Sequence, residues 1–122
     1  MPGLSPGLAY VGRPRGSGRL SGSVIVMVIG ILQIELTIDG ATSLKDKRKV
    51  VSSLKDRLHN EHQVSVAEVD KQDDKRIAIL GIGLVTGDAA HAQSVLDKLV
   101  EKIRNGRGYV LADHTTEILS GR

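Results

Sequence analysis

The sequence predicts an α+β fold in which four antiparallel strands form one sheet and two helices cover one of its faces. Its hydrophobic pattern changes between strand and helix periodicity in the order strand, helix, strand, strand, helix, strand, which is the split β-α-β plan. The two halves of this pattern are weak repeats of one another, and 122 residues without cysteine suffice for one core without disulfides. Right-handed crossovers then give the strand order 4-1-3-2.

The first half begins with VIGILQIELTI (28–38), where apolar and polar residues alternate as in a half-buried strand. Asp39-Gly40 ends this strand with residues typical of turns. Ser43 is the expected N-cap of a helix from about 44 to 60, with Asp46 in a position resembling a capping box. The expected apolar stripe of that helix consists of Leu44, Val51, Leu54 and Leu58.

The second half repeats the order with one strand added. VSVAEVD (64–70) and KRIAILGIGLVT (75–86) are expected strands, and the polar KQDD between them predicts a hairpin turn. Gly87-Asp88 opens a second helix, and Asn105-Gly106 ends it. The last expected strand is YVLADHTTEIL (109–119).

The third strand is apolar on both faces, although a sheet covered by helices on one face needs apolar residues on that face only. Ile77, Ile79 and Val85 share one face, and Leu80, Ile82 and Leu84 share the other. This pattern favours a homodimer that packs sheet against sheet, and a patch tolerated around its two glycines is the alternative. The predicted interface residues are Ile77, Ile79, Gln33 and Glu35.

Residues 1–26 differ from the rest in composition. They hold all three prolines, six of the fourteen glycines and three arginines without any acid, so we expect a disordered extension before a single domain at 27–122. The remainder has equal numbers of cations and acids, so the net charge of +3 comes from this extension, and Met27 is a candidate start. The apolar run at 24–32 is too short for a membrane helix, so we expect a cytoplasmic protein without membrane contact.

The first helix carries an excess of cations. SLKDKRK (43–49) places four of them in its first turns, where the helix dipole disfavours positive charge. A phosphate at that end would make the arrangement favourable, whereas a solvated helix face is the alternative. Lys47 falls within the apolar stripe, so its stem is expected to snorkel past the sheet edge. The predicted nucleic-acid-binding residues are Lys45, Lys47, Arg48, Lys49, Lys55 and Arg57.

Several other functions lack the residues they need. The chain has two tyrosines and no Phe or Trp, so base stacking on the sheet is not expected. His59 and His62 could share a metal but have no third ligand in sequence, and we expect neither a metal nor another cofactor. The turn DGATS has no arginine of the kind that small acyl-phosphate hydrolases need. An enzyme using Asp113 with His114, or Asp70, remains a third reading without a complete catalytic constellation.

The segments SLKDKRKVVSSLKDRL, VSVAEVD and GDAAHAQSVLDKLV resemble the YlxP-like family, small bacterial proteins of unknown function. The resemblance covers about residues 27–119. It implies the ferredoxin-like fold, and it implies a role near ribosomal RNA, because the genes of this family typically neighbour genes for translation initiation and ribosome maturation. It implies no catalytic residues.

The sequence therefore predicts a non-enzymatic accessory factor that contacts the phosphates of structured RNA, on ribosomal RNA or a ribosomal subunit. The alternative is a dimeric scaffold or a small-ligand regulatory module that uses the open sheet face. No small-molecule substrate is evident from the residues.

Overall fold

A computed structural model describes residues 26–121 and confirms the α+β fold. Apart from Val26, the extension predicted to be disordered lies outside the described residues. The elements are β1 (Val28–Thr37), α2 (Leu44–His62), β2 (Ser65–Asp70), β3 (Ile77–Thr86), α3 (Ala89–Arg104) and β4 (Val110–Ser120). Each begins and ends within about two residues of the predicted bounds, as is usual for element ends.

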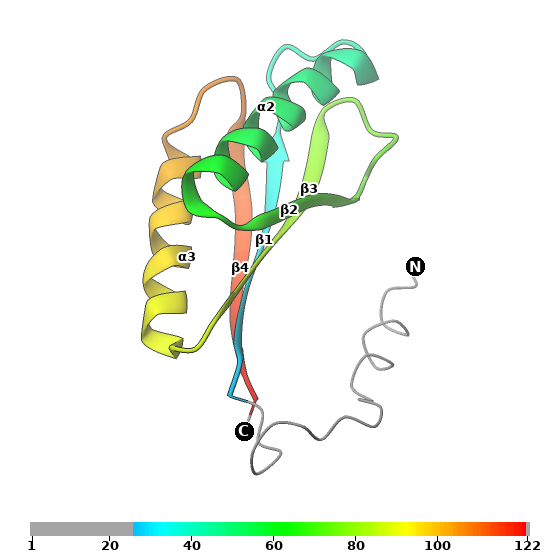
Figure 1. Ribbon diagram of the computed structural model, residues 1–122. Helices are drawn as coiled ribbons and strands as arrows, with labels where there is room; N and C mark the ends of the chain where they lie inside the picture. Colours follow the sequence, from blue (N-terminus) through cyan, green and yellow to red (C-terminus); the bar gives the residue numbers. More distant parts are fainter. Residues whose placement is uncertain (1–25, 122) are drawn as a thin grey trace.

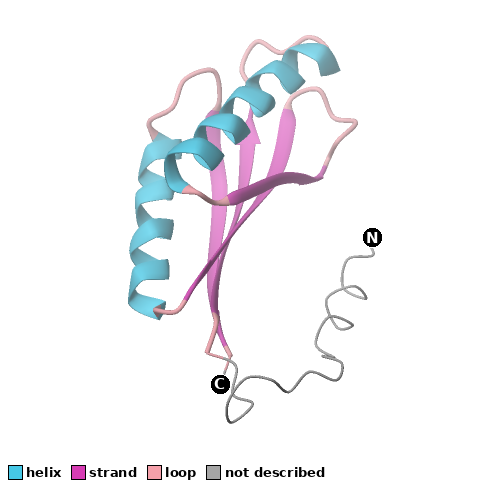
Figure 2. Cartoon of the chain, viewed as in Figure 1, coloured by secondary structure: helices cyan, strands magenta, loops and turns pink. Residues whose placement is uncertain are grey.

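The sheet has the predicted topology. Its order is β2-β3-β1-β4, which is 4-1-3-2 read from the other edge, and every neighbouring pair is antiparallel. Both helices lie on one face of the sheet (Figure 1), with α3 against β1 and β4 and α2 against β2. Figure 2 shows that the opposite face carries no helix, so it is the open face.

The core lies between the sheet and the two helices. Alternate residues of β1 and β3 point into it, and each helix contributes one apolar stripe. The side chains with no measurable exposure include Leu32, Leu36, Leu58, Leu80, Leu96, Leu99 and Ile103. Leu44 is only half-buried, so it is not the core residue that the sequence predicts at the start of α2.

The beginning of α2 is fixed by the predicted cap. Ser43 Oγ accepts a hydrogen bond from the backbone N–H of Asp46 at 3.1 Å. In return Asp46 Oδ2 accepts from Thr42, from its backbone N–H at 3.1 Å and from its hydroxyl at 2.9 Å. These hydrogen bonds lower the pKa of Asp46, so this carboxylate stays charged and satisfies the end of the helix.

The open face carries the apolar residues that the sequence assigned to one side of the third strand. The β1–β3 register places Glu35 opposite Ile79 and Gln33 opposite Gly81, on the face away from the helices. The register of β2 shifts at Val69, whose side chain lies over Gly81 with 3.1 Å between Cγ1 and an ideal Cβ there. Val69, Val85 and Leu119 are 43–66% exposed.

Neither helix in the described range is long and apolar enough to cross a membrane.

Candidate functional site

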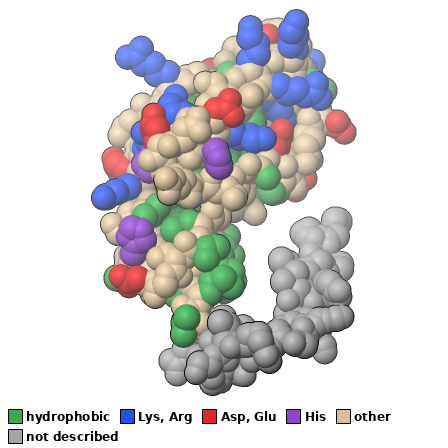
Figure 3. All heavy atoms as spheres, in the orientation of Figure 1, with side chains coloured by type: hydrophobic (Ala, Val, Ile, Leu, Met, Phe, Trp, Pro, Cys, Tyr) green, Lys and Arg blue, Asp and Glu red, His purple; other side chains and the backbone are tan. Residues whose placement is uncertain are grey.

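The outer face of α2 presents three exposed cations near its N-terminus. Lys45, Arg48 and Lys49 are solvent-exposed, and none of them forms an ion pair with another residue of the described range. Most of the visible Lys and Arg side chains gather over the end of the molecule where α2 begins, whereas apolar side chains gather around the far ends of the strands (Figure 3). The structure thus exposes three of the predicted cations at the start of α2. Together with Lys55 and Arg57, which lie further along the helix and on different sides of it, we call these residues the basic face.

Lys47 does not belong to this surface, which corrects the prediction that it contacts nucleic acid. Its side chain is 0% exposed, although its stem was expected to snorkel to solvent. Nζ donates hydrogen bonds to the carbonyl oxygens of Lys71 at 2.8 Å and Ile77 at 3.0 Å. It also forms an ion pair with Glu68 Oε2 at 2.8 Å, without an aligned hydrogen bond. Lys47 thus ties α2 to the β2–β3 hairpin.

Lys55 and Arg57, further along α2, are only half-buried. Arg57 turns toward the connection between α3 and β4 and lines a hollow of about 250 Å³ with residues from both elements. We call it the Arg57 hollow; its lining consists of Lys49, Val50, Ser53, Leu54, Arg57, Arg107 and Tyr109. Three of these seven are cations and none is an acid.

Tyr109 forms the inner wall of the Arg57 hollow. It is only 6% exposed, and among the described residues neither its hydroxyl nor the Nε of Arg57 has a well-aligned hydrogen bond, although the two side chains lie close together. Burial raises the pKa of Tyr109, and the nearby Arg57 guanidinium partly opposes this rise, so the hydroxyl stays protonated at neutral pH. A Cβ at Gly106 would collide with this hydroxyl, so glycine there is what lets the ring pack.

Sequence reasoning missed Arg107, Tyr109 and Ser53 as members of a site. Arg107 and Tyr109 lie in the connection after α3, more than forty residues from α2, and only the fold brings them beside Arg57. Ser53 lies in the middle of α2, where a serine alone gives no sequence signal. The available signal was the combination of Arg107 with two glycines at the end of the second helix, which marks a turn able to present a cation.

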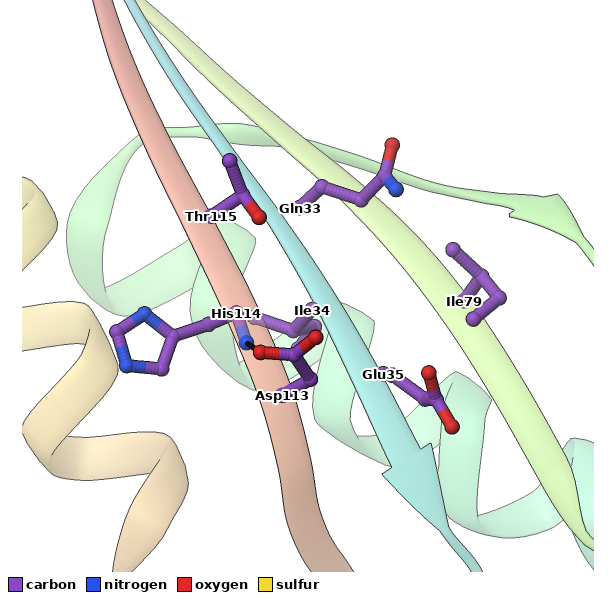
Figure 4. A pocket seen from close by; sticks show the side chains of 7 residues that line it. All are labelled: Gln33, Ile34, Glu35, Ile79, Asp113, His114 and Thr115. Carbon is purple, nitrogen blue, oxygen red and sulfur yellow. Dashed lines mark hydrogen bonds between the residues drawn. The ribbon is translucent and has the colours of Figure 1, made fainter.

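The side chains of Asp113 and His114 point to different sides of β4 (Figure 4). Asp113 lies on the open face opposite Glu35, whereas the imidazole of His114 points toward α3 (Figure 4). The only contact between them in the described range is a hydrogen bond of 2.8 Å from the backbone N–H of His114 to Asp113 Oδ1. The hollow around these residues measures about 60 Å³.

The two histidines at the end of α2 differ in their surroundings. His59 Nδ1 lies 2.8 Å from the carbonyl oxygen of Val64, whereas His62 Nε2 is buried without a hydrogen-bond partner among the described residues, and burial lowers the pKa of His62. Within residues 26–121 no three His, Cys, Asp or Glu side chains are grouped so that they could hold a metal ion.

Comparison with known proteins adds one family and one relative. Residues 29–116 match the model of a family described as "Protein of unknown function (DUF503)". The chain is also 30% identical over 73 residues to the "Uncharacterized protein YlxP" of Bacillus subtilis (strain 168), a match that covers 60% of this chain and 79% of that protein. The region matched by the family model contains all of α2, β2, β3 and α3.

Proposed function

The chain belongs to the DUF503 family of proteins of unknown function, and we propose that it is a non-enzymatic cytoplasmic accessory factor that contacts structured RNA through the basic face. The RNA is ribosomal, on a maturing subunit or during translation, as the resemblance to the YlxP-like family implies. The observation that carries the proposal is the set of exposed cations at the start of α2, none of which is paired in the described range.

The helix dipole explains why these cations suit an anionic partner. Each cation near the positive end of a helix costs about 0.3–1 kcal/mol, so Lys45, Arg48 and Lys49 gain nothing from their own backbone. A phosphate beside the first turns interacts favourably with the side chains and with the dipole at once. Backbone phosphates give affinity without sequence preference, in keeping with a face that has no aromatic side chain for stacking.

Binding of a ribosomal RNA fragment by the wild-type protein tests this proposal. If all five cations of the basic face neutralise phosphates, log affinity should fall with log salt with a slope of about −3.5 to −4.5. Fluorescence anisotropy at several salt concentrations measures that slope. Binding that is undetectable at low salt, or a slope near zero, would leave the basic face as a solvated helix surface.

A second candidate function, a dimeric scaffold that uses the open face, is favoured by the apolar residues there. Val69, Ile79 and Val85 lie on that face, which no helix covers. The open-face hollow beside Gln33 and Glu35 measures about 60 Å³, against roughly 300–1,000 Å³ for small-molecule sites. A second copy of the chain therefore suits this face better than a small ligand.

We expect light scattering at micromolar concentration to give about twice the 13.0 kDa mass of one chain. Ile79→Asp should return the mass to that of one chain, because it places a carboxylate beside Glu35 within the interface. Ser94→Asp, on the exposed side of α3, should leave the mass unchanged. A wild-type protein that stays at one chain mass would remove this candidate.

A further inference from the structure

The Arg57 hollow differs from the rest of the basic face because its cations line one hollow between two segments of the chain. Lys49 and Arg57 come from α2, and Arg107 comes from the connection after α3. None of the three pairs with an acid of the described range, and the neighbouring open hollow on α2 differs in that Asp56 lines it. Three unpaired cations around one space repel one another unless an anion lies between them.

The polar side chains that line the hollow can all donate hydrogen bonds. Arg57 Nε and the Tyr109 hydroxyl are buried close together, and neither has a well-aligned hydrogen bond within residues 26–121, although the guanidinium is near enough to lower the pKa of Tyr109. Ser53 adds a hydroxyl to the lining. Two guanidinium groups, an ammonium group and a hydroxyl around one space suit a ligand rich in acceptor oxygens.

We propose that the Arg57 hollow binds a single phosphomonoester group, held by Arg57, Arg107 and Lys49. A monoester carries nearly two negative charges at neutral pH and three terminal acceptor oxygens, so it matches three cations better than the singly charged diester of an RNA backbone. At about 250 Å³ the hollow is smaller than most small-molecule sites, so it takes the phosphate and not a whole cofactor. Tyr109 acts as a positioning residue, because its hydroxyl lies against the Arg57 guanidinium.

The proposal does not depend on RNA binding, although the end of an RNA chain is one source of such a phosphate. A nucleoside monophosphate is the other source, and both present the same chemistry. The Arg57 hollow lies beside Lys49, which it shares with the open surface of α2, so an RNA end seated there could continue along the basic face.

Titration of the full chain with inorganic phosphate, followed by NMR of the arginine Nε–H signals, tests the site at constant ionic strength. We expect a saturable shift of the Arg57 signal. Arg107→Gln should weaken phosphate binding about ten- to hundredfold, the loss expected for one charge-assisted contact. Arg76→Gln, an equal charge change at the exposed end of the β2–β3 hairpin, should leave the affinity unchanged.

Tyr109→Phe separates a positioning role from a purely structural one. It removes only a hydroxyl that has no well-aligned hydrogen bond within residues 26–121, so thermal stability should change little. The phosphate-induced shift of Arg57 Nε–H should change in size, and the affinity should fall several-fold. A variant that binds phosphate like the wild type would show that the hydroxyl does not position Arg57.

Two further ligands identify the source of the phosphate. Adenosine 5′-monophosphate binding at least as tightly as inorganic phosphate indicates a free nucleotide. A short 5′-phosphorylated oligoribonucleotide binding more tightly than both, and than its 5′-hydroxyl form, indicates an RNA end. The proposal is overturned if neither inorganic phosphate nor these ligands give a saturable shift, or if Arg107→Gln binds them like the wild type. If the wild-type protein binds phosphate but does not bind the unphosphorylated ribosomal RNA fragment, that result counts against the basic face and not against this site.

Discussion

Lys47→Met is expected to lower the free energy of unfolding by about 3–5 kcal/mol, although the residue lies within the most basic stretch of the chain. For a domain of this size the melting temperature should fall by at least about 12 °C. Methionine keeps the apolar stem but removes the ammonium group. Glu68 is then left as a mostly buried carboxylate without its cation, and the carbonyl oxygens of Lys71 and Ile77 each lose a donor.

The matched control is Lys45→Met, the same substitution two residues earlier on the exposed side of the same helix turn. It should change the free energy of unfolding by no more than about 0.5 kcal/mol. Adding Glu68→Gln to Lys47→Met should restore part of the loss, because no buried carboxylate then remains. Chemical denaturation of the four proteins gives these values. Equal stability of the two methionine variants would contradict the role given to Lys47.

The order of elements and the sheet topology could be predicted because both depend on local patterns. The alternating residues of β1 and the apolar stripe of α3 follow the hydrophobic periodicities of a strand and a helix. Ser43 and Asp88 are helix caps whose hydrogen bonds involve residues only two to three positions away. The register shift at Val69 could not be predicted in this way. It arises from how an edge strand fits its neighbour, and single-sequence periodicity carries no information on that fit.

The candidate site was less accessible to sequence reasoning for a related reason. Helical angle correctly placed Lys47 in the core stripe of α2, but a lysine there is expected to snorkel unless acceptors are known to lie above it. Its acceptors, on Lys71, Ile77 and Glu68, belong to a hairpin whose position over α2 only the fold gives. The same holds for Arg107, which is an ordinary loop residue until α3 and β4 bring it beside Arg57.

The joint substitution of Lys45, Arg48 and Lys49 by glutamate is expected to abolish most of the binding to ribosomal RNA fragments. Removing three phosphate contacts should make the negative slope of log affinity against log salt shallower by about 2.1–2.7. Because the new carboxylates also repel phosphates, affinity at low salt should fall by about a hundredfold or more. Fluorescence anisotropy at several salt concentrations measures both quantities.

Folding should survive this triple substitution, which is what makes it informative. The three side chains are exposed, and acids near the N-terminus of a helix interact favourably with its dipole, by about 0.3–1 kcal/mol each. The melting temperature should therefore stay equal or rise slightly. Lys47 must be left in place, because its loss would destabilise the fold, and partial unfolding would mimic a loss of binding.

The matched control reverses three other exposed cations, Lys75, Arg76 and Lys98, so that the net charge changes equally. Lys75 and Arg76 lie on the β2–β3 connection, next to the buried side of α2, and Lys98 lies on α3, so none of the three belongs to α2 itself. If binding reflects only the overall charge, both triple variants should lose the same affinity and the same slope. If the start of α2 holds the phosphates, only the reversal of Lys45, Arg48 and Lys49 should lower the affinity and the slope. The control variant should then keep nearly the wild-type slope. Equal losses in the two variants would count against a site on α2, because phosphates held directly by Lys45, Arg48 and Lys49 depend only weakly on charges on other elements, which salt screens.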